Sequence, residues 1–205
     1  MRHAESTWNL TGRYQGRIDT ELSEQGQEQA RLLAESLGSI HLDAIYSSPL
    51  RRVLHTAIAI GLPQNLDIQI ESDLTEIDHG AWNGLLRSEV EKRYGPLLQQ
   101  WLASPSKVRM PRGESLGDVN VRANRSLVRI LKVYPEGTAV ICSHNAVLKV
   151  IIAASIGIDL DRFWVMGIDN ASVSILEFGD RRPRLLCLND TCHLGQYHSA
   201  PEQAL

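Results

Sequence analysis

The sequence lacks several features that mark broad classes of protein. Its 205 residues carry 21 basic and 24 acidic side chains, a formal net charge of −3, so no general nucleic-acid or anionic-membrane surface is expected. No apolar run approaches membrane-spanning length, and the amino-terminus has no signal-peptide core. The three cysteines are an odd count at no metal-ligand spacing, which favours a reducing compartment. We therefore expect a cytoplasmic protein without a nucleic-acid or membrane partner, in which any anion site is local.

What remains is an ordinary globular composition, with 43% hydrophobic and 22% charged residues. A chain of this length can bury a full core, so one domain over 1–205 is the default. Helices and strands alternate along it. Periodicity and caps predict helices over 24–37 behind Ser23, over 49–60 with Pro49 in the first turn, and over 86–102, 114–134 and 146–156. Apolar runs predict strands over 42–46, 138–142, 171–178 and 183–188.

This order predicts an α/β sheet with helices on both faces. Active sites in such sheets lie beyond the carboxyl ends of the strands, where Ser47-Ser48 and Ser143-His144 fall. Arg2-His3 and Arg51-Arg52 add cationic forks and a second histidine. Arginine matches phosphate oxygens, and histidine can attack phosphorus or donate to an oxygen near neutral pH. Two histidines and two or three arginines together predict a phosphate pocket.

The motifs resemble the histidine phosphatase superfamily, which has the phosphoglycerate mutase-like fold. Five blocks follow the family's order over nearly the whole chain, namely Arg2-His3-Ala4-Glu5, Ser47-Ser48-Pro49-Leu50-Arg51-Arg52, Leu74-Thr75-Glu76-Ile77-Asp78-His79-Gly80, Gly113-Glu114-Ser115 and Ser143-His144. The resemblance implies a three-layer sandwich with a mostly parallel sheet flanked by helices.

The resemblance also implies the roles of the central residues. His3 would be the nucleophile that forms a phosphohistidine, and His144 would donate to the phosphoryl group in the transition state. Arg2 and Arg52 would clamp the phosphoryl oxygens, so that no metal or other cofactor is required. Arg51 and Arg52 are adjacent at a helix start, so only one can point inward; the family spacing favours Arg52.

Further positions follow from the same motifs. Asn9, Gln15 and Gly16 would bind the substrate's phosphoryl group, although Asn9 could instead cap a turn and Gln15 could lie on the surface. Glu76 would be the general acid that protonates the leaving alcohol and then the base that activates water. Acidic neighbours leave an alternative open, and Asp78 is next in line.

These roles predict a metal-independent phosphomonoesterase acting on a small phosphorylated metabolite. A phosphoglycerate mutase is the runner-up; mutases of the family carry a long insertion after the Glu76 block, whereas here one helix leads directly to Gly113. A non-catalytic phosphometabolite-binding or interaction protein is a third reading, and a homodimer is open.

Two features depart from the family's pattern. Ala4, Asn145 and Ala146 stand where glycines are common, which puts fine pocket geometry in question. Family members also have an apolar strand directly before the Arg-His pair, where this chain has only Met1. We expect a slot in the sheet at that place, and a natural product that begins roughly five to eight residues upstream, a typical strand length.

Overall fold

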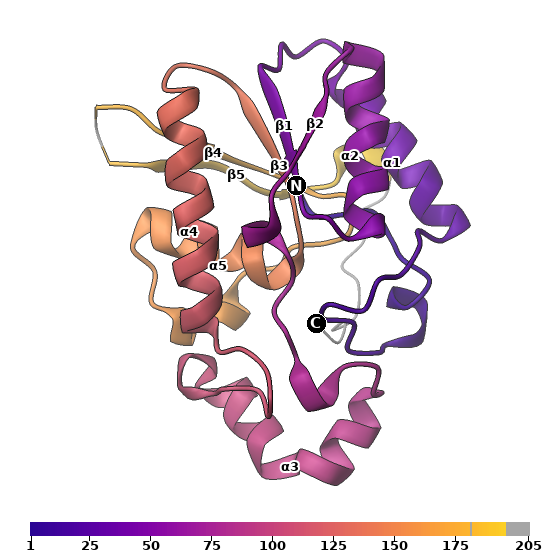
Figure 1. Cartoon of the computed structure of the whole chain (residues 1–205), viewed down its shortest axis with the longest axis vertical. Coiled ribbons are helices and arrows are strands. Elements are labelled where there is room, and N and C mark those ends of the chain that lie inside the picture. The colour runs from indigo at the N-terminus through magenta and orange to yellow at the C-terminus, as the bar shows by residue number, and fades with distance from the viewer. Residues whose placement is uncertain (181, 196–205) are drawn as a thin grey trace.

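The computed structural model describes residues 1–180 and 182–195, so the last ten residues of the expected 1–205 domain lie outside it (Figure 1). A parallel three-stranded sheet has the order β2-β1-β3, from β2 Ile68–Ile70, β1 Ala44–Ser47 and β3 Ala139–Cys142. A separate antiparallel pair joins β4 Val173–Glu177 to β5 Arg184–Asp190. The α/β class is confirmed, with the sheet in two parts.

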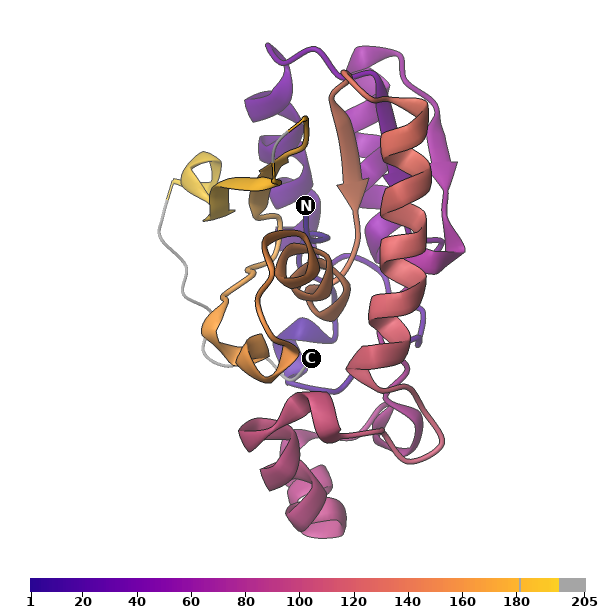
Figure 2. The ribbon, with the colours of Figure 1, turned by 90° about the vertical axis from the view of Figure 1, so that its left-hand side faces the viewer.

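Helices cover both faces of the parallel sheet (Figures 1 and 2). They are α1 Glu24–Leu37, α2 Arg51–Gly61, α3 Arg87–Ala103, α4 Leu116–Val133 and α5 Asn145–Ile156. Alternation along β1 divides the core, because Ile45 packs with the cluster formed by α1 and α2, while Ala44 and Tyr46 pack with the cluster formed by α4 and α5. The result is the predicted three-layer arrangement, with α3 beyond one end of it.

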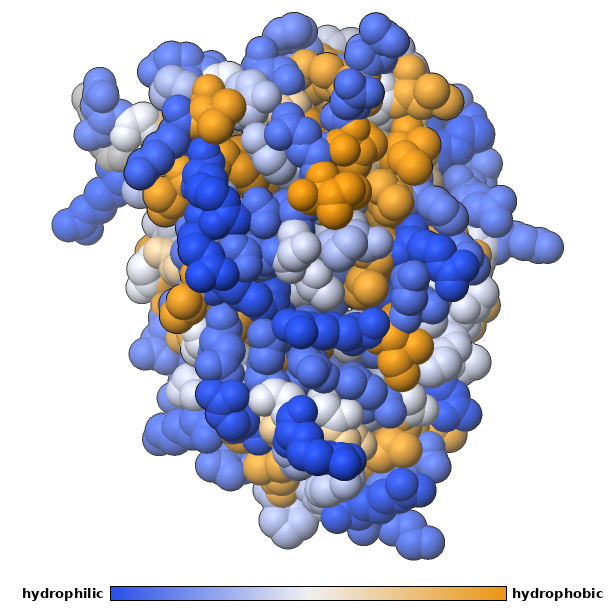
Figure 3. All heavy atoms as spheres, in the orientation of Figure 1, coloured by the Kyte–Doolittle hydropathy of each residue, from blue (hydrophilic) through white to orange (hydrophobic). Residues whose placement is uncertain are grey.

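Local sequence explains where the helices begin. The Ser23 side chain accepts a hydrogen bond from the Gly26 N–H and caps α1. Ser115 and Asp118 form a reciprocal capping box at the start of α4. Figure 3 shows a band of hydrophilic side chains along α4, as expected for a helix with one buried face. No helix among the described residues is both long and apolar enough to cross a bilayer.

Several predicted boundaries are wrong by one or two residues. Pro49 lies before α2 and not in its first turn, because Leu50 keeps an extended backbone and caps the helix at Arg51. The strand predicted over 171–178 starts at Val173, since Ala171 has φ 55° and breaks the extended run. β2 was not predicted at all. It is an edge strand of three residues in which Ile68 is half-buried and Ile70 is exposed, which leaves little hydrophobic signal.

The start of the chain lies between the two sheets. Arg2 forms an isolated parallel bridge with Ser143, directly after β3, and the Arg2 N–H donates to the Ser172 carbonyl before β4 at 3.2 Å. Met1 to His3 therefore occupy only one end of the position between β3 and β4. This arrangement brings His3 beside the carboxyl end of β3.

Candidate active site

His3 and His144 lie next to each other at the carboxyl ends of the strands. His144 caps α5 immediately after β3, and the His3 N–H donates to the Ser143 carbonyl at 3.0 Å. The ring centroids are 5.3 Å apart in an edge-to-face arrangement, and both rings are buried. Segments separated by 140 residues of chain thus meet as the strand-end argument predicts.

The contacts of His3 fix its protonation. Its Nδ1 lies 2.7 Å from the Ala4 carbonyl oxygen, which can only accept, so we assign the ring proton to Nδ1. Burial, followed by the charges of Arg52 and Arg2, holds the pKa of His3 well below its ordinary value. The imidazole is therefore neutral near pH 7 and keeps a lone pair on Nε2, the form that can attack phosphorus.

His144 is held in the opposite tautomer. Arg52 Nη2 donates to Nδ1 at 3.3 Å, which places the ring proton on Nε2, 2.9 Å from Ser48 Oγ. Burial and the Arg52 charge keep the pKa of His144 well below its ordinary value. Ser48 thus orients a ring that can donate from Nε2. In the sequence, the only signal at Ser48 is its position at the end of a predicted strand.

Two buried guanidinium groups flank the histidines. Arg52 donates to the carbonyl oxygens of Ile18 and Gly16, each at 2.8 Å, and Arg2 Nη1 donates to the Ile168 carbonyl at 2.6 Å. Burial lowers the pKa of each to about 10, so both remain charged near neutral pH. Arg52 Nε is buried and has no hydrogen-bond partner among the described residues. Two such charges close together in a buried setting can bind a doubly charged anion.

The Gly16 carbonyl helps to hold Arg52 inside the pocket, whereas the neighbouring Arg51 points to the surface. Gly16 has φ 50°, and a Cβ there would lie 2.2 Å from Asn83 Oδ1, so this turn requires glycine. Arg51 instead lies at the surface, where its Nε lies 3.0 Å from a carboxylate oxygen of Asp19. Arg52 is the inward-facing residue of the pair.

Asn9 and Gln15 lie in the loop that follows His3. The Asn9 side-chain oxygen accepts from the Ser6 N–H at 2.9 Å, and Asn170 Nδ2 lies 3.4 Å from it. The Gln15 side-chain oxygen accepts from the Thr20 hydroxyl at 2.9 Å. Because these contacts are made by the amide oxygens, the amide nitrogens of Asn9 and Gln15 point away from them and can serve as neutral donors.

Glu76 is the carboxyl group of this pocket. It is buried, and its Oε1 accepts from the Ile77 N–H at 2.9 Å. Burial raises its pKa above the ordinary value, against the opposing influence of Arg52 and Arg2. Asp78, the alternative, accepts from the Gly80 N–H at 2.8 Å and from Asn83 Nδ2 at 2.9 Å, and its pKa is lowered. The environment of Glu76, and not that of Asp78, suits a general acid.

Comparison with known proteins identifies this arrangement. The family model of the histidine phosphatase superfamily (branch 1) matches residues 1–191. The chain belongs to the histidine phosphatase superfamily. It is 43% identical to phosphoserine phosphatase 1 of Hydrogenobacter thermophilus over 205 residues, all of this chain and 97% of the relative.

Solved structures agree with this membership. YhfR of Bacillus stearothermophilus superposes with a TM-score of 0.90 at 30% identity, over 94% of this chain and 96% of the other. A mutant phosphoserine phosphatase from Entamoeba histolytica, solved with phosphoserine, gives a TM-score of 0.83 at 28% identity over 94% and 96%. The predicted fold is confirmed, and the chain is a hydrolytic phosphatase.

In this histidine phosphatase a residue that sequence analysis missed supports Glu76. Arg122, on α4, donates to the Glu76 carbonyl at 3.1 Å and to the Asp73 carbonyl at 2.8 Å. It also forms a largely buried ion pair with Glu114 at 3.0 Å. Glu114 in turn accepts from the Asp78 N–H at 3.0 Å. The signal was an arginine on the apolar face of α4, in line with Val119 and Ala123.

The departures from the family's glycines cause no backbone strain. Ala4 and Asn145 are not among the residues with positive φ. The Ala4 N–H donates to Thr56 Oγ1 at 3.1 Å, and Asn145 is the first residue of α5. Both residues therefore fit their places without the conformational freedom of glycine.

Proposed function

We propose that this histidine phosphatase hydrolyses small phosphomonoesters through a phosphohistidine on His3, without a metal ion. The observation that carries the proposal is the neutral His3 ring, with Nδ1 bound to the Ala4 carbonyl, beside two buried guanidinium groups. A neutral imidazole is a competent nucleophile. Arg2 and Arg52 supply the fixed positive charge that phosphoryl transfer needs.

In the first half-reaction, His3 Nε2 donates its lone pair to phosphorus and the bond from phosphorus to the ester oxygen breaks. The Glu76 carboxyl group gives its proton to the departing alkoxide and becomes a carboxylate. The raised pKa of Glu76 supports this role, because a protonated carboxyl must persist near neutral pH. His144 Nε2–H donates to a phosphoryl oxygen after leaving Ser48, and Asn9 and Gln15 donate through their amides.

The second half-reaction reverses the role of Glu76. Its carboxylate takes a proton from a water molecule, whose oxygen attacks phosphorus as the bond to His3 Nε2 breaks. Inorganic phosphate leaves, and Glu76 is protonated again. The clamp formed by Arg2 and Arg52 holds the same oxygens through both steps, so the pocket needs no rearrangement between them.

O-phosphoserine is the first substrate to test, because relatives that resemble the whole chain are named phosphoserine phosphatases. Phosphate release should be measured from a panel containing O-phosphoserine, 3-phosphoglycerate, sugar phosphates and p-nitrophenyl phosphate. We expect the highest kcat/KM for O-phosphoserine, and no isomerisation of 3-phosphoglycerate faster than phosphate release. Failure to hydrolyse any phosphomonoester would contradict the proposal, and dominant isomerisation would favour the mutase reading.

We also propose a cytoplasmic location. Cys142, Cys187 and Cys192 are all free thiols, which suits a reducing compartment. Fractionation of cells with an antibody to this protein should recover it with cytoplasmic markers; recovery from an oxidising compartment would contradict this placement.

A further inference from the structure

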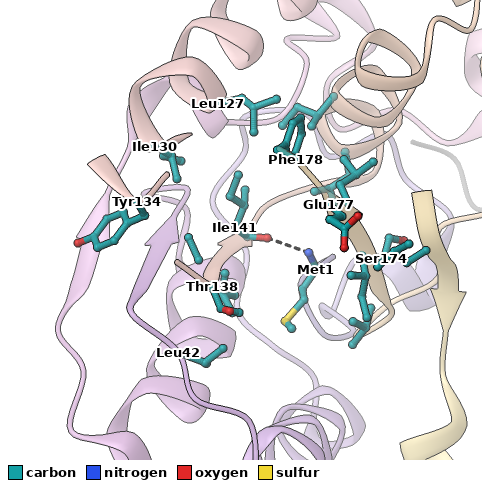
Figure 4. Close-up of a pocket in the computed structure, with 18 of the residues that line it drawn as sticks. Met1, Leu42, Leu127, Ile130, Tyr134, Thr138, Ile141, Ser174, Glu177 and Phe178 are labelled. Atoms are coloured by element: carbon teal, nitrogen blue, oxygen red, sulfur yellow. Dashed lines mark hydrogen bonds between the residues drawn. The ribbon is translucent and has the colours of Figure 1, made fainter. Parts of the chain in front are cut away.

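Helix α5 buries a positive charge. Lys149 is only 4% exposed, and its neighbours Leu148 and Ile151 line the apolar cavity between β3 and β4 (Figure 4). No residue that the structure describes forms a hydrogen bond or an ion pair with the Lys149 ammonium. Lysine is almost never fully buried unless it is paired, because an unpaired charge loses its hydration without compensation. The ammonium is therefore available to an anionic ligand.

Two aromatic rings hold this ammonium in place. Its Nζ lies 4.6 Å from the ring centre of Phe163 and 5.1 Å from that of Trp164. Trp164 Nε1 donates to the Trp101 carbonyl at 2.9 Å, which ties this aromatic wall to α3. Aromatic faces attract a cation, but they leave its N–H donors available to an oxygen atom. The rings thus fix the position of Lys149 without neutralising its charge.

The same face of α5 leads back to the catalytic pocket. Asn145 lies one helical turn before Lys149 and directly after His144, so the side chains of Asn145 and Lys149 are neighbours on the helix surface. The Asn145 side chain is buried, and its Oδ1 has no hydrogen-bond partner in the described part of the chain. Two polar side chains with unused hydrogen-bonding groups therefore extend from His144 towards the aromatic wall.

The aromatic wall and the catalytic loop are connected by one short segment. Shortly after Trp164, the Ile168 carbonyl accepts from Arg2 Nη1 at 2.6 Å. Asn170 Nδ2 then donates to the His3 carbonyl at 3.0 Å. The segment that positions the Lys149 ammonium thus also supports the residues that would hold and attack the phosphoryl group.

Charges of the catalytic pocket reach Lys149. Burial and then the positive charge of Arg2 lower the pKa of Lys149 to about 8, while the negative charges of Glu76 and Asp169 act in the opposite direction. The ammonium form therefore predominates at pH 7. Asp169 is turned to another partner, since its Oδ2 accepts from Asn189 Nδ2 at 2.8 Å. Lys149 thus lies near the phosphoryl site with a charge that no described carboxylate pairs with.

We propose, on the basis of the phosphatase reaction above, that Lys149 binds a carboxylate on the alcohol half of the substrate, with the Asn145 amide beside it. The two charges of Arg2 and Arg52 already match a phosphoryl dianion, which leaves the third positive charge for a second anionic group. A carboxylate fits a single ammonium, whereas a second phosphate would call for another arginine fork. The preferred substrates are phosphomonoesters of hydroxy acids, O-phosphoserine among them.

Two substrates that differ only in the carboxylate test this proposal. O-phosphoserine and O-phosphoethanolamine carry the same phosphate ester and the same amine, and we expect the enzyme to prefer O-phosphoserine by about 10–100-fold in kcat/KM. Lys149→Met keeps an unbranched side chain between the rings but removes the charge. It should cancel most of this preference by raising KM for O-phosphoserine, and kcat/KM for O-phosphoethanolamine should change by less than about threefold. Lys149→Arg should retain most of the preference.

The matched control is Lys132→Met, the same substitution at an exposed position of α4, which should leave both substrates unchanged. Urea denaturation should show Lys149→Met to be at least as stable as the wild type, because an unpaired buried charge has been removed. Equal losses on both substrates in Lys149→Met would overturn the proposal. So would a wild-type enzyme that does not discriminate between the two substrates, a result that requires no variant.

Calorimetry on the His3→Ala enzyme separates the carboxylate site from the reaction, because binding requires no nucleophile. In that background, Lys149→Met should raise the Kd of O-phosphoserine by about 10–100-fold and leave that of O-phosphoethanolamine within about threefold. An unchanged Kd for O-phosphoserine would overturn the carboxylate site even if a phosphohistidine forms on His3. The expected change in Kd without any phosphohistidine would support the site and contradict the proposed reaction.

Discussion

At the scale of single residues, burial sets the protonation state of the reacting groups. Burial lowers the pKa of His3 and His144 and raises the pKa of Glu76. Each shift favours the neutral form, which for a histidine is the nucleophile and for a carboxyl group is the acid. Arg2 and Arg52 keep their charge because a pKa of about 10 still lies well above neutral pH. The pocket therefore combines neutral reacting groups with fixed positive charge.

Replacing the proposed acid should separate substrates by their leaving group. Glu76→Gln keeps the shape of the side chain but cannot supply the proton. Turnover of an alkyl phosphate such as O-phosphoserine should fall by about 10²–10⁴-fold. p-Nitrophenyl phosphate should lose far less, since a phenolate of low pKa leaves without protonation. Burst kinetics on both substrates would check the phosphorylation step; equal loss on both would move the acid elsewhere, with Asp78 as the next candidate.

The pH dependence follows from the direction of the Glu76 shift. Because burial raises its pKa, the protonated acid persists above the ordinary range and is lost as pH rises through the folded-state value. The kcat for O-phosphoserine should therefore fall on the alkaline side. His3, whose pKa is lowered, stays neutral throughout this range. The alkaline fall should be absent in Glu76→Gln; a fall of the same size in that variant would show that another group titrates.

Gly16 tests how closely the clamp depends on backbone position. A Cβ at Gly16 would collide with Asn83 and displace the carbonyl that holds Arg52. Gly16→Ala should lower kcat/KM by about 10–100-fold, the range for a misplaced catalytic group. Gly12→Ala is the matched control, because Gly12 also has positive φ but nothing lies within 4 Å of its added Cβ. Equal losses of kcat/KM would assign the effect to backbone strain alone.

The sequence predicted which residues would lie together in the candidate site, but not their protonation states. His3, Arg52 and His144 stand in motifs whose order places them together at strand ends. The tautomer of His144 depends on Ser48 and Arg52, and the pKa of Glu76 depends on how much chain covers it. Both are products of packing between distant segments, which no local pattern encodes.

At the scale of elements, α4 supports the segment that carries Glu76. Arg122 extends from the buried face of α4 to three backbone carbonyls of that segment, those of Asp73, Thr75 and Glu76. Its ion pair with Glu114 ties the start of the same helix into the network. A single arginine thus fixes the loop around Glu76, which belongs to neither a strand nor an α-helix.

Removing that arginine should loosen the loop and weaken the fold. Arg122→Met removes one of the two arginines at the Glu114 carboxylate, the other being Arg17, and it takes away the donor of three backbone carbonyls. The free energy of unfolding should therefore fall by about 3 kcal/mol. Urea denaturation would measure this loss. If the arginine positions Glu76, turnover of O-phosphoserine should fall more than that of p-nitrophenyl phosphate. Arg125→Met is the control on the same helix: its ion pair with Asp73 is exposed, so neither quantity should change much. Similar effects of the two variants would contradict the role given to Arg122.

Elements with strong local signals were predictable and those without were not. Ser23 and Ser115 act as caps, and both helices behind them were expected within about two residues. β2 has no long apolar run and only Ile68 packs against the core, so its pairing with β1 is the main feature that defines it. The start of β4 is likewise set by the positive φ of Ala171 and by pairing with β5, and not by propensity.

At the scale of the whole molecule, the fold gathers residues from the first sixteen positions, from α2, from the loop before α3 and from the end of β3 into one pocket. The order of elements placed only Ser47-Ser48 and Ser143-His144 at this edge of the sheet; the first sixteen residues and the Glu76 loop were expected there from the family resemblance. A gap in the sheet before the Arg-His pair was expected from the family's pattern. The register of the first residues against β3, with Met1 beside Ile141, is known only from the folded structure. The central claim is that all of these parts serve transfer of a phosphoryl group to His3.

Rapid quench of the enzyme during turnover of ³²P-labelled O-phosphoserine tests that claim most directly. We expect a phosphoprotein that is labile to acid and stable to base, with the label on the peptide that contains His3. His3→Ala should form no such species and should lose several orders of magnitude in turnover. His144→Ala, which removes the neighbouring ring but keeps the nucleophile, should still accumulate label, at a reduced rate. A His3→Ala enzyme that keeps a near-normal rate, or label on another residue, would contradict the account.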